Sequence, residues 1–150
     1  MLVSRKTSKT FEPATEGTHL GVLCDVVALG AQDTPFGERE KVRLVWLLDE
    51  KDDEGHPKRA FATYTVSLHE KSRLFGAVRS ITGRIPEEEP FDLDSLIGRV
   101  SQLVLEHTTA NGKVYANIAA ILKAPAGATF PIPPDFRRKA AKTEETEEVF

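Results

Sequence analysis

The sequence lacks most of the features that mark secreted, membrane-spanning and disulfide-bonded proteins. Cys24 is the single cysteine among 150 residues, so no internal disulfide can form and a reducing cytoplasm is the expected compartment. No apolar run approaches the roughly 20 residues that a membrane-spanning helix needs. Residues 1–10 hold three basic side chains but no apolar stretch, so we expect no secretory signal. These absences predict a cytoplasmic protein without a membrane partner.

The usual signatures of catalysis and metal binding are also missing. The four histidines show no metal-ligand spacing, and a lone cysteine excludes a zinc knuckle. His69-Glu70 begins like a zinc-protease helix motif, but Arg73 stands where the second histidine is required. No phosphate-binding glycine loop and no nucleophile elbow is present. We therefore expect no enzyme, with no catalytic residue, no metal and no cofactor.

The charge of the chain is unevenly distributed. The net charge is −3, but residues 143–150 hold four glutamates and no base. The remaining 142 residues carry 20 basic and 19 acidic side chains, which leaves them at +1. A body of this charge is compatible with a basic groove on one face.

The first half of the chain has the period of β-strands. Residues 18–31 are apolar with interspersed glycines and predict one long, bent strand, and a turn is expected around Pro35 and Gly37. In residues 41–50, KVRLVWLLDE, the even-numbered apolar residues around Trp46 are expected to face the core and the odd-numbered ones to face outward. Residues 59–68, RAFATYTVSL, predict a third strand.

The period changes at Ser67. Ser67 and Glu70 fit a capping box, and a helical apolar stripe follows, ended by Gly83 after about 15 residues. The stripe consists of Leu74, Ala77, Val78 and Ile81. Residues 91–98 predict a short helical turn with Asp92 as N-cap and Gly98 at its end. Two further strands, RVSQLVLEHT and KVYANIAAILKA, are joined through Asn111-Gly112, a hairpin signal.

Three strands, a helix and a two-stranded hairpin predict an all-β fold with one main helix. A five-stranded OB barrel has its helix between strands three and four, whereas a β-sandwich needs more strands. We expect a flexible N-terminal arm, the OB domain, a Pro-rich and basic linker, and a disordered acidic tail. Their respective ranges are 1–11, 12–123, 124–142 and 143–150.

Binding has better support than catalysis. OB barrels that bind single strands combine a basic groove with aromatic rings on which bases stack. Such side chains occur on the predicted second and third strands and beside the two hairpin turns. The candidates are Phe36, Lys41, Arg43, Lys58, Arg59, Phe61, Lys113 and Tyr115. A structural interpretation stays open, in which the rings plug the barrel ends and the cations confer solubility.

The C-terminal residues form a second candidate site. A disordered end gains nothing from a large apolar residue, whereas a recognition peptide gains an anchor and a free carboxylate. The partner-binding candidates are Glu144, Glu145, Glu147, Glu148, Val149 and Phe150.

The tail EETEEVF resembles those of bacterial and phage single-stranded DNA-binding proteins, which are OB folds with acidic tails and a terminal aromatic residue. It departs from the bacterial form in lacking Asp and the Pro before Phe. Segments such as KVRLVW, FDLDSLIGR and NGKVYANI are also similar to small phage and prophage OB proteins of this class. The resemblance implies protection of single-stranded DNA in replication, recombination and repair, in a bacterial or phage-infected cell, with the tail recruiting partner proteins.

Two alternatives stay open. An OB-fold adaptor or inhibitor encoded by a mobile element would bind a protein and no nucleic acid, and an RNA-binding OB domain cannot be separated from a DNA-binding one by sequence. A homo-oligomer is compatible with any of these.

Overall fold

The computed structural model describes residues 13–87, 91–134, 136 and 138, and its strands form one antiparallel sheet. The spatial order of the strands is β3-β2-β1-β4-β5. Their bounds are Gly17–Thr34 for β1, Gly37–Lys51 for β2, Pro57–Thr65 for β3, Val100–Ala110 for β4 and Lys113–Lys123 for β5. The mostly β class and the five strands confirm the coarse prediction. Among the described residues, no helix is long and apolar enough to cross a membrane.

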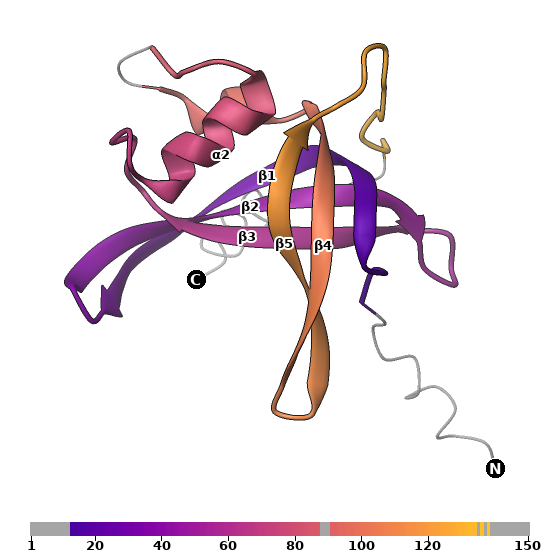
Figure 1. Cartoon of the computed structure of the whole chain (residues 1–150), viewed down its shortest axis with the longest axis horizontal. Coiled ribbons are helices and arrows are strands. Elements are labelled where there is room, and N and C mark those ends of the chain that lie inside the picture. Colours follow the sequence, from indigo (N-terminus) through magenta and orange to yellow (C-terminus); the bar gives the residue numbers. More distant parts are fainter. Residues whose placement is uncertain (1–12, 88–90, 135, 137, 139–150) are drawn as a thin grey trace, which may run out of the picture.

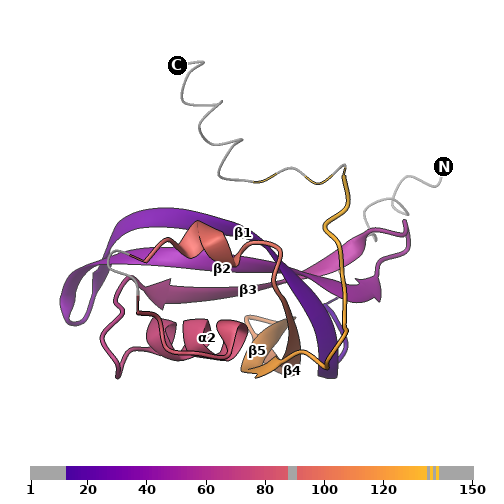
Figure 2. The same ribbon diagram turned by 90° about the horizontal axis from the view of Figure 1, so that it is seen from above.

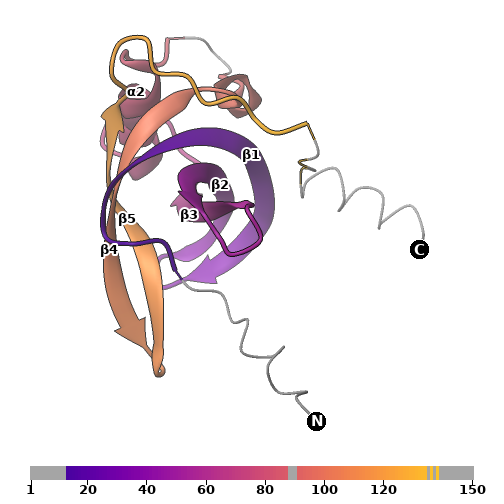
Figure 3. The same cartoon turned by 90° about the vertical axis from the view of Figure 1, so that its right-hand side faces the viewer.

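The strand β1 bends so that it can pair with two different neighbours. It pairs with β4 from Gly17 to Val22 and with β2 from Gly21 to Thr34. Bulges interrupt its pairing with β2 at two places, and each bulge bends and twists a strand. As a result β4 and β5 run across the direction of β2 and β3 (Figure 1), and β1 curls around β2 and β3 when the molecule is seen from its end (Figure 3).

The inner face of the sheet carries the main core. In β2, the even-numbered residues Val42, Leu44, Trp46 and Leu48 are all buried, which confirms the predicted facing of this strand. The helix α2, Arg73–Thr82, packs its four predicted apolar positions onto the same cluster. It lies beside β3 and β5 (Figure 2). As predicted, α2 comes between the third and fourth strands in the chain.

The predicted start of this helix is wrong. Ser72, not Ser67, is the N-cap, and its Oγ accepts a hydrogen bond of 3.1 Å from the Phe75 N–H. Ser67 instead stabilises the preceding turn: its Oγ accepts from the His69 N–H, and its carbonyl accepts from Ser72 Oγ. The capping-box spacing is present at Ser67 and absent at Ser72, so local spacing favoured the serine that does not cap the helix. Gly83 ends the helix in the left-handed conformation, as predicted.

The two smaller turns follow their sequence signals. Asp92 is the N-cap of the 3-10 helix η1, Leu93–Leu96, and its Oδ1 accepts from the Asp94 N–H at 3.0 Å. Ile97 is the C-cap, and Gly98, predicted at the end of the turn, follows it with a positive φ. Asn111 and Gly112 both have positive φ, as a two-residue hairpin turn requires.

A second apolar cluster lies on the outer face, which the sequence analysis expected to be open. Val45 and Leu47 are buried there together with Val22, Cys24 and Val27. Phe130, Ile132 and Phe136 pack against these side chains. Arg138 adds an ion pair of 2.9 Å from its Nε to Oδ1 of the buried Asp25. We call Phe130, Ile132, Phe136 and Arg138 the C-terminal strap. The sequence analysis assigned all four to a linker and did not anticipate these contacts.

Trp46→Ala is expected to destabilise the domain by about 3–5 kcal/mol, because the side chain is fully buried and its removal leaves a cavity. Trp46→Phe should cost clearly less, because it also removes an indole N–H that has no hydrogen-bond partner among the described residues. Urea unfolding followed by far-UV circular dichroism measures both. A stable Trp46→Ala protein would contradict the assignment of the strand faces.

Candidate nucleic-acid interface

A strip of cations and one aromatic ring runs along the outer face of β2 and β3. In the register of these strands Val45 pairs with Phe61, Arg43 with Thr63 and Lys41 with Thr65. The Arg43 guanidinium carbon lies 5.7 Å from the centroid of the Phe61 ring, and the ring is 51% exposed. Lys41 Nζ donates to Thr65 Oγ1 at 2.8 Å. The structure thus brings Lys41, Arg43 and Phe61 onto one face.

Arg39 extends this strip and was missed by the sequence analysis. It follows the same odd-numbered alternation as Lys41 and Arg43, pairs with Gln32 of β1, and is exposed. Continuing the alternation two residues toward the start of β2 would have found it. Residues two apart on a strand are about 6.6–6.8 Å apart, so three cations follow one another at even intervals.

The turn between β1 and β2 holds an exposed aromatic ring at the end of the strip. Phe36 is 82% exposed. Thr34 fixes the turn, because its Oγ1 donates to the Gly37 carbonyl at 2.6 Å and accepts from the Phe36 N–H at 3.1 Å. An open hollow of about 490 Å³ joins this turn to the strip. Its lining residues are Asp33, Thr34, Pro35, Phe36, Arg39, Lys41 and Thr65. We call Phe36, Arg39, Lys41, Arg43 and Phe61 the outer strip.

Two other predicted cations are engaged by protein groups. The Arg59 guanidinium carbon lies 5.1 Å from the centroid of the Phe136 ring, so this side chain packs against the C-terminal strap. Lys58 is mostly buried, and its Nζ lies 2.9 Å from Glu50 Oε2 and 3.4 Å from the Pro13 carbonyl. Both partners are remote in sequence, and no local pattern announces them.

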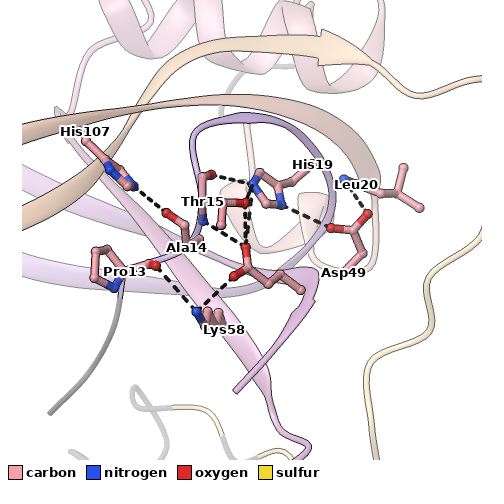
Figure 4. A network of polar contacts seen from close by, with 9 residues as sticks. Pro13, Ala14, Thr15, His19, Leu20, Asp49, Lys58 and His107 are labelled. Carbon is pink, nitrogen blue, oxygen red and sulfur yellow. Dashed lines mark hydrogen bonds and ion pairs between the residues drawn. The ribbon is translucent and has the colours of Figure 1, made fainter. Parts of the chain in front are cut away.

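Lys58 belongs to a polar network that fixes the start of the described chain to the sheet (Figure 4). His19 Nε2 donates to the Thr15 carbonyl at 2.7 Å, and its Nδ1 lies 3.3 Å from Asp49 Oδ1. Glu50 Oε1 accepts from the backbone N–H of Thr15 at 2.9 Å and from its hydroxyl at 3.0 Å. The network holds residues 13–15 against β1 and the end of β2, so we assign it a structural role.

Lys113 and Tyr115 lie apart from the outer strip. They begin β5 in the β4–β5 hairpin, where Tyr115 pairs with Thr108 and is 47% exposed. The β1–β2 and β4–β5 hairpins project from the body in different directions (Figure 1). The two residues therefore form a separate aromatic and basic pair at the other hairpin.

The predicted tail site, Glu144, Glu145, Glu147, Glu148, Val149 and Phe150, lies outside the described residues. In the part of the chain that is described, no three His, Cys, Asp or Glu side chains are placed to hold a metal ion. The Cys24 thiol is buried, which raises its pKa to about 12 and makes it a poor nucleophile. No protein-family model matches the chain, and a search of the curated proteins finds no match.

Glu50→Gln should lower the stability of the fold at neutral pH and make that stability less dependent on acid. Partial burial raises the pKa of Glu50. Hydrogen bonds from the Thr15 N–H, Lys58 and the Thr15 hydroxyl lower it by more than burial raises it, so the pKa is below its usual value. Such a carboxylate stabilises the fold above its unfolded-state pKa, and this stabilisation is lost as the pH falls through the folded-state pKa. We expect the variant to lose about 1–2 kcal/mol near pH 7 and to show a shallower loss below about pH 5.

Urea midpoints measured from neutral to acidic pH test this, with Glu87→Gln as the exposed control. Parallel pH profiles of wild type and Glu50→Gln would contradict the assignment.

Proposed function

We propose that this protein binds single-stranded DNA along the outer strip, without catalysis, and serves in DNA replication, recombination and repair. The observation that carries the proposal is the alignment of Arg39, Lys41 and Arg43 between two exposed rings, Phe61 and Phe36. Binding of single strands without sequence preference needs cations that follow the backbone and rings on which bases stack. The outer strip offers both, but few side chains suited to reading base edges.

We further infer that the sheet closes into a barrel of the OB type. The order β3-β2-β1-β4-β5 leaves β3 and β5 at the two edges, and residues of these two strands approach to within 8 Å between Cα atoms. In an OB barrel the face of strands 2 and 3 and the loops after strands 1 and 4 bind oligonucleotides. The outer strip and the pair of Lys113 and Tyr115 occupy the corresponding positions.

In this mode a strand lies along β2 with its phosphates toward the three cations. A base stacks on Phe61, whose ring is held by Arg43 on one side and is half exposed. The bound DNA strand cannot continue past Phe61 along β2, because the C-terminal strap covers Val45 and Leu47. The strap thereby limits the site to the half of β2 that leads to the β1–β2 turn.

The proposal gives residues 143–150 a second role in recruiting partner proteins. The glutamates resemble a phosphate backbone in charge and compete weakly for the outer strip, and bound DNA releases them. Val149 and Phe150 then offer an apolar anchor and a terminal carboxylate to replication or recombination proteins. The cytoplasm is the proposed compartment, because the lone cysteine is buried and reduced.

Replacing Lys41 and Arg43 by Ala should weaken binding for all sequences. The logarithm of affinity falls against the logarithm of salt with a slope of about −0.7 for each neutralised phosphate of a single strand. The double variant should therefore flatten the slope by about 1.4, and Phe61→Ala should cost about 1–3 kcal/mol of binding.

Fluorescence anisotropy with labelled dT, dA and mixed oligonucleotides across a salt series measures both effects, with the exposed Lys71→Ala as control. Binding that is absent, or insensitive to salt and to these variants, would favour the protein-binding adaptor instead.

Deletion of residues 143–150 should tighten DNA binding at low salt, and the gain should vanish at high salt, where screening removes the competition. The same deletion should abolish capture of replication or recombination proteins. Phe150→Ala should lose capture while keeping the low-salt competition, since it retains all four glutamates. If the deletion changes neither DNA affinity nor capture, the tail has no role in either process.

A further inference from the structure

We infer that the tip of the β1–β2 hairpin stacks on the end of a duplex, so that the preferred ligand is a junction at which a single strand leaves double-stranded DNA. This inference rests on the proposed function and adds the class of DNA substrate. Pro35 and Phe36 form the stacking surface, and the outer strip receives the departing strand.

The tip stands clear of the rest of the molecule. The strand β1 pairs with β4 only as far as Val22, and β2 pairs with β3 only as far as Lys41. Beyond these points the two strands continue as a hairpin up to Thr34 and Gly37, with one further backbone hydrogen bond of 2.9 Å from the Val66 N–H to the Glu40 carbonyl. The hairpin projects from the body in both views (Figures 1 and 2), so a bulky ligand can reach its end.

Phe36 is the most exposed large apolar side chain among the described residues, at 82%. A ring exposed at the end of a hairpin adds nothing to the core, and a ligand that covers it gains the free energy of burying its apolar surface. The turn is fixed by the two hydrogen bonds of Thr34, and Pro35 restricts its backbone further. The ring is therefore carried on a preorganised support, which lowers the entropy lost on binding.

The hairpin has one basic face and one acidic face. Arg39 and Lys41 lie on the face that continues the outer strip. On the opposite face Glu38 pairs directly with Asp33, which also reaches the edge of the hollow, and Glu40 follows two residues later. If the hairpin entered a groove of duplex DNA, phosphates would flank both faces, and the acidic face would be repelled. The repulsion is avoided when a single DNA strand lies on the basic face and the end of the duplex stacks on the tip.

The distances fit a ligand that continues from the tip onto the strip. Val45, the partner of Phe61, lies eight residues after Gly37, which corresponds to about 26 Å along β2. The three cations lie between these two ends. A terminal base pair offers two bases to the tip, and stacking on one base already changes affinity roughly fivefold or more.

The experiment compares three fluorescein-labelled DNAs at one salt concentration. They are a blunt DNA hairpin, the same hairpin with a single-stranded dT overhang of either polarity, and the dT strand alone. Wild type should bind the better overhang hairpin at least about fivefold tighter than the free strand, and the blunt hairpin most weakly. Phe36→Ala should reduce the ratio of overhang to free strand to near one, and Phe36→Trp should keep it.

Ile85→Ala is the matched control, because Ile85 is also an exposed apolar side chain (55%) but lies outside the outer strip. Circular dichroism establishes that each variant is folded. 2-Aminopurine in the terminal base pair should change its emission on binding wild type but not Phe36→Ala.

Equal binding of overhang hairpin and free strand by wild type, or a preference that survives Phe36→Ala, would overturn this inference and leave single-strand binding intact. Failure of wild type to bind any of the three DNAs would overturn the proposed function as well.

Discussion

The bend of β1 is the constraint on which the rest of the structure depends. One strand must pair with β4 over its first residues and with β2 over the remainder, and these neighbours run in different directions. Gly21 lies where both pairings overlap, and a Cβ there would come within 2.9 Å of Leu103 Cδ1. The absence of a side chain at Gly21 lets the two parts of the sheet approach, and the two bulges supply the curvature. The inner face encloses Trp46 as a consequence, and the outer face of β2 is presented to solvent only before Val45, where the C-terminal strap does not cover it.

The sequence predicted those parts of the fold that depend on local periodicity. The alternation in β2 identified Val42, Leu44, Trp46 and Leu48, and the 3.6-residue period identified the buried face of α2. Gly83 and Asn111-Gly112 were recognised because left-handed backbone is a local requirement. The start of α2 was misplaced because the capping-box spacing favoured Ser67, whereas the N-cap is Ser72, which has no Glu or Gln three residues later. Ser67 lies in the turn before the helix, where its carbonyl accepts from Ser72 Oγ.

The sequence predicted those residues of the candidate site whose position follows from the alternation of side chains along a strand. Alternation placed Lys41, Arg43 and Phe61 together, and a longer application of the same rule would have added Arg39. Lys58 and Arg59 could not be assigned from the sequence, because their environment is set by Glu50 and by Phe136. The strap was missed for the same reason: Pro-rich composition suggested a linker, whereas Phe130 and Phe136 find apolar partners on a distant strand. Partners far apart in sequence are chosen by tertiary packing.

The complete burial of Trp46 has a spectroscopic consequence. It is the single tryptophan of the chain, and its ring lies on the inner face, opposite the outer strip. The rings of that strip, Phe36 and Phe61, scarcely emit when the indole is excited selectively. Intrinsic emission therefore reports the integrity of the core and is silent toward a ligand on the outer face. The folding of the domain can be followed through Trp46 emission, and the binding of a labelled ligand to the outer strip can be followed in the same sample through the label.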